Sequence, residues 1–204
     1  MVIPGRHSCW CLLLAVGLVL VACAATTTLV NQWTNPAYTG RSFKRVMVIG
    51  VSRQESLRRT FEDEFVSQLR SAGVDAVPGY RYLPEEGKVE ESRLRSALAQ
   101  AQADAVIITR LVKREEKTEV TPGFYQPSLP GFYGWYSTGW SGYYEPPRVS
   151  RYDVYTSETS LYDAAKNQMI WSGTAQTTAP GDINQEIKNY AALMVRALKE
   201  KKLI

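Results

Sequence analysis

Histidine and cysteine are almost absent from this chain of 204 residues. Its single histidine, His7, and its three cysteines, Cys9, Cys11 and Cys23, all lie within the first 23 residues. Residues 24–204 therefore offer no imidazole or thiolate for a Ser-His-Asp or Cys-His catalytic arrangement, and no ligands for the common zinc sites. Because these residues cannot form a disulfide with one another, their fold must depend on a packed apolar core.

Sequence motifs of other catalytic and phosphate-binding sites are missing as well. The sequence contains no Ser-x-x-Lys nucleophile pattern and neither of the two common glycine-rich phosphate-binding loops. The net charge is only +4, and the charges occur in mixed clusters such as residues 113–117 rather than in a long basic run. Nucleic-acid binding is therefore disfavoured, and we predict no cofactor and no metal.

A long hydrophobic run is also lacking. The first apolar stretch, residues 12–20, is too short for a permanent membrane helix, which needs about 20 residues. With Arg6 before it and small residues after it, the stretch is typical of a cleaved export signal. Its end, Leu20-Val21-Ala22-Cys23, resembles the lipobox of bacterial lipoproteins.

That resemblance implies that residues 1–22 are a lipoprotein signal peptide and that Cys23 carries fatty acyl chains such as palmitate. The next residue is Ala24 rather than aspartate. In a Gram-negative host the resemblance then implies sorting to the periplasmic side of the outer membrane, with an inner-membrane or surface lipoprotein as alternatives. An ordinary secretory signal with an incidental cysteine stays open as well.

The remaining chain is long enough for one domain. Residues 23–43 are rich in Thr and Asn and lack apolar periodicity, which predicts a lipidated amino terminus and a tether. Fully extended, this tether would reach roughly 60 Å. A short strand around Trp33 would be compatible with it, with Trp33 covering an edge of the domain. We place the folded domain at residues 44–204.

The pattern within that domain alternates between strands and helices. Strands are expected at residues 46–51, 74–77 and 105–112, the last continuing as a polar arm toward Val120, and helices from about residue 53 to Gly73 and at 91–103. An antiparallel hairpin at 151–163 and 168–178 and a terminal helix capped by Asp182 follow. The predicted fold class is α/β (α+β): a mixed sheet built from β-α-β-α-β, an antiparallel hairpin and a C-terminal helix, with helices packed on the sheet.

Several segments carry a family resemblance. They are Trp33-Thr34-Asn35-Pro36, residues 44–51, the spacing Arg59-x-x-Glu62-Asp63-x-Phe65, and residues 103–111, 161–163 and 170–174. Together with the lipobox they resemble a family of exported bacterial lipoproteins of unknown function. Most of these residues are packing and turn positions, so the resemblance implies a fold and a location but no mechanism.

Paired carboxylates leave one enzymatic route open, because glycoside hydrolysis needs only two of them. The candidates are Glu62, Asp63 and Glu64, Glu85-Glu86, Glu90-Glu91 and Glu115-Glu116. Each lies near Arg or Lys, so we expect solvated charges on helix faces, turns or edge strands. We therefore predict a binding protein without catalytic residues; the alternative is a protein that binds glycan or peptidoglycan, or a carboxylate-dependent glycan hydrolase.

The most unusual segment is residues 121–148. Its 28 residues include nine aromatics, five glycines and five prolines, and its only charges are Glu145 and Arg148. This density of proline and glycine precludes a regular helix or a central strand. Aromatic side chains are enriched at binding surfaces, which makes five residues candidates for partner or ligand contact: Tyr125, Tyr133, Trp135, Tyr136 and Trp140.

Three interpretations of this aromatic insert compete. It could be a docking surface for another envelope protein or for a second copy of the chain. Its rings could stack on the sugars of a glycan such as peptidoglycan. It could also be a partly disordered hairpin extension whose rings cover the edge of the sheet. Contact of Trp and Tyr with the membrane interface is compatible with a lipid anchor at Cys23.

Overall fold

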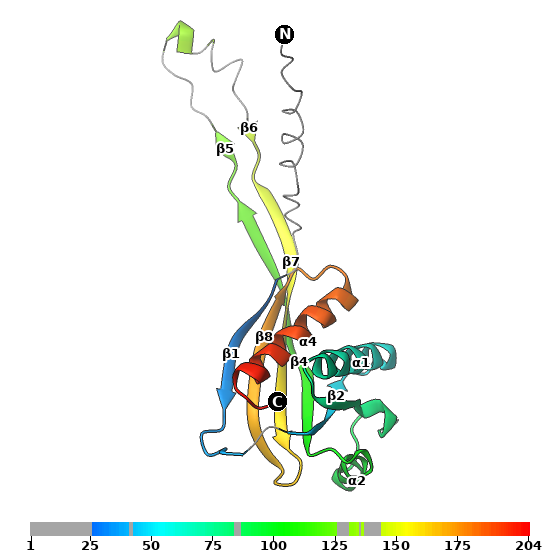
Figure 1. The fold of residues 1–204 in the computed structure, drawn as a ribbon. Helices are drawn as coiled ribbons and strands as arrows, with labels where there is room; N and C mark the ends of the chain where they lie inside the picture. The colour runs from blue at the N-terminus through cyan, green and yellow to red at the C-terminus, as the bar shows by residue number, and fades with distance from the viewer. Residues whose placement is uncertain (1–25, 41–42, 84–86, 126–130, 135, 137–143) are drawn as a thin grey trace, which may run out of the picture.

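The computed structural model describes residues 26–40, 43–83, 87–125, 131–134, 136 and 144–204. Its centre is a six-stranded mixed sheet with helices on both faces (Figure 1). The strand order is β1-β8-β7-β4-β2-β3, in which β2, β3 and β4 run parallel and the other neighbours antiparallel. The strands are β1 (Thr26–Thr34), β2 (Arg45–Val51), β3 (Asp75–Pro78), β4 (Ala105–Thr121), β7 (Arg148–Asp163) and β8 (Gln168–Thr178). The predicted fold class is confirmed.

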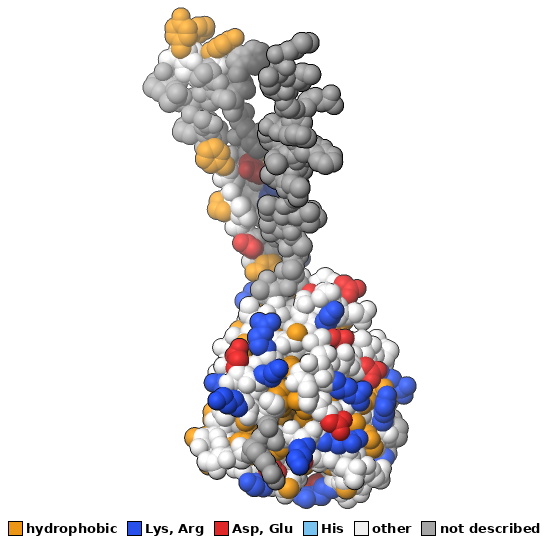
Figure 2. Space-filling model, in the orientation of Figure 1, with side chains coloured by type: hydrophobic (Ala, Val, Ile, Leu, Met, Phe, Trp, Pro, Cys, Tyr) orange, Lys and Arg blue, Asp and Glu red, His pale blue; other side chains and the backbone are white. Residues whose placement is uncertain are grey.

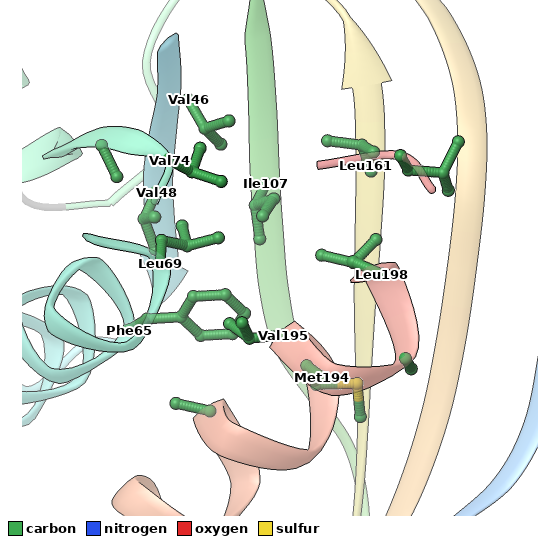
Figure 3. Close-up of a cluster of buried hydrophobic side chains, with 14 of the residues drawn as sticks. Val46, Val48, Phe65, Leu69, Val74, Ile107, Leu161, Met194, Val195 and Leu198 are labelled. Carbon is green, nitrogen blue, oxygen red and sulfur yellow. The ribbon is translucent and has the colours of Figure 1, made fainter. Parts of the chain in front are cut away.

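Both faces of the central strands are covered, as their continuous apolar sequence predicts. Helices α1 (Glu55–Ser71) and α4 (Ile183–Glu200) pack on one face, and α2 (Glu91–Ala101) packs on the other. Along β2, Val46 and Val48 enter the core under α1 and α4, whereas Met47 enters the cluster under α2. Figure 3 shows side chains of α1, α4 and the central strands meeting in the larger of these two clusters.

Two helix ends match their sequence signals. Gly73, just beyond α1, has a φ of 88°, a left-handed conformation that glycine adopts without strain. At the start of α4 the Asp182 carboxylate accepts a hydrogen bond from the Gln185 N–H at 2.8 Å. The side chain of Gln185 does not return the bond but donates to Asn189 Oδ1 at 2.9 Å.

The tether prediction is wrong over residues 26–34, although the short strand expected around Trp33 is confirmed. These residues form β1, which pairs antiparallel with β8 from Thr26↔Thr178 to Thr34↔Trp171. Their β-branched residues suit a strand, and β8 would otherwise expose an unpaired edge. The strand ends at Asn35, which is 9% exposed: its N–H donates to the Ile170 carbonyl at 2.8 Å and its side-chain amide to the Met169 carbonyl at 3.2 Å. Trp33 is 45% exposed on this edge strand.

The predicted hairpin of β7 and β8 is confirmed, with one irregularity. The register shifts between Leu161, opposite Trp171, and Tyr162, opposite Met169, so that Ile170 is an extra residue in β8. Strict alternation would place Ile170 and Trp171 on opposite faces of the sheet. Because of this bulge both side chains are fully buried in the same core cluster.

Strands β4 and β7 continue well beyond the sheet. The last residue of β4 that pairs with β2 is Arg110, and the first residue of β7 that pairs with β8 is Val154. Past these points, among the residues that the structure describes, β4 and β7 pair only with each other, as far as Thr121↔Arg148. The short strands β5 (Phe124–Tyr125) and β6 (Tyr144–Glu145) continue this ribbon. We call residues 111–153 the arm, which projects from the domain in Figure 1.

Candidate binding surface: the arm and the groove at its base

The stem of the arm is a polar two-stranded ribbon. Eleven residues of β4, 111–121, extend beyond the last pair with β2, which at about 3.3 Å per residue gives roughly 36 Å. Arg114 binds Asp153 across the ribbon with an N···O distance of 2.8 Å, and its guanidinium lies 5.5 Å from the ring centre of Tyr155. The hydrogen bond from Arg114 lowers the pKa of Asp153. Such cross-strand contacts stabilise a ribbon that has no hydrophobic core.

Aromatic side chains lie beyond the stem and are exposed. Phe124 is 61% exposed, Phe132 76%, Tyr133 83% and Tyr136 55%. Phe132 contacts Tyr133 edge-on with a centroid distance of 5.3 Å and stacks on Tyr136 at 6.4 Å. Figure 2 shows hydrophobic side chains on the arm, well away from the body of the domain. The interpretation that the rings cover the edge of the sheet is therefore wrong for these four residues.

The structure describes three of the five candidate residues of the insert. Tyr133 and Tyr136 are exposed and share a cluster with Phe132. Tyr125 belongs to β5 and pairs with Tyr144. Trp135 and Trp140 lie outside the described residues, as does the lipidation candidate Cys23.

A groove that the sequence did not reveal lies at the base of the arm. Its volume is about 690 Å³, and it lies between the first turns of α1 and α4, the end of β2 and the root of the ribbon. The apolar part of its lining comprises Val51, Leu57, Phe61, Ile183, Ile187 and Tyr190. Val51 and Ile183 are 60% and 55% exposed. No local sequence signal marks these two residues, because Val51 ends a continuous apolar run and Ile183 begins the apolar stripe of a helix.

Beneath the groove runs a buried chain of hydroxyl groups. The Tyr190 hydroxyl lies 2.8 Å from Thr159 Oγ1, which lies 2.7 Å from Thr109 Oγ1. Burial raises the pKa of Tyr190, so the phenol stays protonated at neutral pH. The groove thus combines an apolar part and a neutral hydroxyl floor with charged lining residues, which are Arg58, Arg110, Glu116, Arg151, Asp153 and Glu186. Apolar walls with a few polar and charged groups are typical of a ligand-binding site.

Glu62 contradicts the prediction of a solvated carboxylate. Its side chain is completely buried, although it lies on α1 near the exposed Asp63. Glu62 Oε1 accepts hydrogen bonds from the Gly50 N–H at 3.0 Å and from Arg58 Nε at 3.1 Å, and Oε2 accepts one from the Tyr80 N–H at 2.7 Å. Burial raises the pKa of Glu62, and these bonds oppose the increase.

The role of Glu62 is structural. It joins α1 to the end of β2 and to the 3₁₀ turn Gly79–Arg81. The partner Arg58 is itself buried and also donates to the Leu83 carbonyl. No substrate could reach this carboxylate without displacing the network.

Of the other described carboxylate candidates, Glu116 lines the groove, together with Asp153 and Glu186, whereas Asp63, Glu64, Glu90, Glu91 and Glu115 do not. Asp63 accepts from the Tyr80 hydroxyl at 2.9 Å, Glu64 from the Gln68 amide at 2.8 Å, and Glu91 and Glu115 lie in ion pairs with Arg95 and Lys113. Glu90 and Glu116 are exposed, and Glu85 and Glu86 lie outside the described residues. Within the described part of the chain, no three His, Cys, Asp or Glu side chains cluster as metal ligands would.

The fold and this surface define a mixed α/β domain that carries an aromatic arm. In the residues that the structure covers, no helix has the length and apolarity needed to cross a bilayer. The chain belongs to the DUF4136 family, a domain family of unknown function, whose profile matches residues 88–200. That match includes the whole arm.

Solved structures show a partial likeness of fold. The chain is 15% identical to PelC from the PelC dodecamer of Paraburkholderia phytofirmans, covering 83% of this chain and 96% of that one with a TM-score of 0.46. It is 11% identical to the lipoprotein GNA1162 of Neisseria meningitidis, covering 78% and 96% with a TM-score of 0.40. At these values neither likeness bears on function. No curated protein matches the chain.

Proposed function

We propose that this protein is a lipid-anchored accessory component of the bacterial cell envelope that works by binding through its arm and has no catalytic activity. The observation that carries this proposal is the arm itself: a stem of two paired strands holds exposed aromatic side chains away from the domain. Exposed apolar clusters of this kind mark interaction sites.

The position of the first residue of β1 supports a binding site close to the membrane. The first residue of β1, Thr26, pairs with Thr178, and Thr178 pairs on its other side with Val154, where the arm leaves the sheet. Two strand spacings of about 4.8 Å therefore separate Thr26 from the root of the arm. The three-residue connection from Cys23 to Thr26 spans at most about 11 Å.

A lipid on Cys23 would thus hold the root of the arm near the membrane, in contrast to the long tether expected from sequence. The stem, at roughly 36 Å, is longer than that connection, so an arm directed toward the membrane brings its aromatic residues to the lipid headgroups and to proteins embedded there. Tyr and Trp suit both environments, because their rings are apolar and carry a polar group. An envelope protein or a second copy of the chain is the partner we favour.

A glycan is the alternative partner, because Tyr133 exposes most of its side chain and a free ring face can stack on a sugar. Hydrolysis of that glycan is disfavoured by the structural roles of Glu62, Asp63 and Glu64. Amide substitution of Asp63, Glu64, Glu90 and Glu91 should leave the cellular phenotype intact. Loss of function in that variant would favour the hydrolase.

The test of the proposal is removal of the insert without disturbing the stem. Residues 122–147 are replaced by Asn-Gly, which favours a tight two-residue hairpin turn and preserves the pair Thr121↔Arg148. The matched control replaces three exposed residues of α4, Asn184, Lys188 and Glu200, by alanine. We expect the shortened arm to lose co-purifying envelope partners or retention on peptidoglycan, and the control to keep them. Unchanged partners and retention in the shortened protein would contradict the proposal.

A further inference from the structure

We propose that two copies of the chain pair antiparallel along the outer edge of β4, over residues 113–119, with Glu116 on the two-fold axis. The partner is a second copy of this chain, and the surface is the stem of the arm. The inference goes beyond the proposed function, because it depends on the polar stem and not on the aromatic insert.

The outer edge of β4 is free where the stem begins. In the described structure β2 covers this edge only as far as Val51↔Arg110, and the opposite edge of β4 is occupied by β7 throughout. From Leu111 to Thr121 the outward backbone N–H and C=O groups therefore have no strand partner among the described residues. Such an edge can pair with another strand unless charges prevent it.

Hydrogen-bond geometry restricts how β4 can pair with its own copy. In an antiparallel ladder two opposite residues direct their backbone groups either both toward the partner strand or both away from it. Neighbouring residues of one strand point in opposite directions. In a symmetric dimer one residue must therefore lie opposite the same residue of the second copy, with the two-fold axis between them. Registers centred between two neighbouring residues are excluded, which leaves few possibilities.

Charges select one of these registers. With the axis at Glu116, Lys113 lies opposite Glu119 of the second copy and Glu115 lies opposite Lys117, and symmetry repeats both pairs. The only like-charged pair is Glu116 with itself.

The neighbouring registers are poorer. An axis at Glu115 places Lys113 opposite Lys117, and an axis at Lys117 places Glu115 opposite Glu119. Each of these registers also places a like charge on the axis. An axis at Arg114 keeps one kind of opposite-charge pair, Lys113 with Glu115, and an axis at Thr118 places Glu116 opposite Val120. Only the register at Glu116 therefore has two kinds of opposite-charge pair and no charge opposite an apolar side chain.

The ends of the paired segment fit this register as well. The register of β4 with β7 shifts between Leu111 and Lys113, so the regular ribbon begins at Lys113, opposite Glu119 of the second copy, and runs to Thr121. Pro122 follows and has no N–H to continue the ladder.

The outer edge of β7 is a weaker candidate. The Ala179 N–H donates to the Asp153 carbonyl at 2.8 Å, so the free part of this edge is limited to residues 148–152. Those five residues include Arg148 and Arg151 and no acidic side chain. Self-pairing there gains no opposite-charge pair.

Disulfide trapping in native membranes tests the register. Residues directly opposite in an antiparallel pair have Cα atoms about 4.5–5.5 Å apart, within the range of a disulfide. Glu116→Cys should therefore form a covalent dimer under mild oxidation. Thr118→Cys should not, because the two Thr118 positions are four residues out of register, or about 13 Å apart. The double variant Arg114→Cys/Thr118→Cys should form the dimer again, because these positions face each other between copies.

The unsubstituted chain, which keeps Cys23, gives the background of this experiment. Equal trapping of Glu116→Cys and Thr118→Cys, or trapping of neither Glu116→Cys nor the double variant, would overturn the proposal.

Charge exchange gives an independent test with the detergent-solubilised full chain. Lys113→Glu and Glu119→Lys each turn two attractive pairs into repulsive ones, and each should raise the dimer dissociation constant by about tenfold or more. The double exchange Lys113→Glu/Glu119→Lys should restore it to within about threefold. Glu116→Gln should strengthen the dimer, because it removes the like charges at the axis. A double exchange as weak as the single variants would overturn the register, whereas shortening the insert should leave the dimer unchanged.

Discussion

The buried carboxylate of Glu62 should be one of the most sensitive positions in the domain. Glu62→Ala removes the acceptor for the Gly50 N–H, the Tyr80 N–H and Arg58 Nε. The guanidinium of Arg58 then stays buried without its closest carboxylate, since Glu55 lies farther away at 3.5 Å. Breaking a buried ion pair at one partner costs about 3–5 kcal/mol, a large fraction of the roughly 5–15 kcal/mol that stabilises a typical domain.

The assay is urea or thermal unfolding followed by circular dichroism. For a domain of this size each kcal/mol corresponds to roughly 2–4 °C in Tm, so we expect Glu62→Ala to lower Tm by about 6–20 °C. Asp63→Ala is the matched control, because Asp63 is the next residue of α1 and is exposed; its effect should stay within about 0.5 kcal/mol. The double variant Arg58→Ala/Glu62→Ala should cost less than the sum of the single variants. A loss below about 1 kcal/mol for Glu62→Ala would refute this reasoning.

Four further predictions concern the turn after β1, a helix cap, a titration and the location of the protein. Asn35→Ala leaves the Met169 carbonyl without its side-chain donor, and should destabilise the domain by about 1–3 kcal/mol in urea unfolding. Asp182→Ala should cost about 1 kcal/mol by the same measurement, whereas Gln185→Ala, whose side chain does not bond to Asp182, should cost less. Because burial raises the pKa of Glu62, its contribution to stability is complete below the pKa of the unfolded chain and is lost as pH rises through the folded pKa. The wild type should therefore lose stability relative to Glu62→Gln as pH increases from 4 to 7, and a constant difference would contradict the raised pKa. In a Gram-negative host Ala24→Asp should move the protein from outer-membrane to inner-membrane fractions, and unchanged fractionation would contradict the outer-membrane location.

The elements that could be predicted from sequence are those whose signal is local. Residues 46–51 are apolar without interruption, which is sufficient to indicate a strand covered on both faces. The cap at Asp182 and the left-handed Gly73 likewise depend on a few neighbouring residues. Their prediction needs no knowledge of which distant segments meet.

The features that sequence analysis missed depend on distant partners. Strand β1, of which only a short stretch around Trp33 was expected, has no strong periodicity of its own and forms because β8 offers an open edge 137 or more residues away in sequence. In the sequence, Glu62 looks like a polar residue of an exposed helix face. Only the folded structure shows that the Gly50 and Tyr80 N–H groups donate hydrogen bonds to its carboxylate. The groove arises only where the first turns of α1 and α4 approach the root of the arm.

The arm was anticipated in part. A polar continuation of the strand toward Val120 could be predicted, because residues 113–119 are charged or polar and contain no proline or glycine. The start of β7 was predicted at Arg151, three residues too late, because residues 148–150 have no clear apolar pattern. Its pairing with β4 supplies the backbone hydrogen bonds that its side chains do not predict.

Photocrosslinking in the native envelope tests the central claim, binding through the arm, most directly. A photoreactive amino acid replaces Tyr133 on the arm, and in a second variant it replaces Lys188, an exposed residue of α4. We predict that the probe at position 133 captures a defined envelope component and that the probe at position 188 does not. Capture from position 188 but not from position 133 would contradict the account.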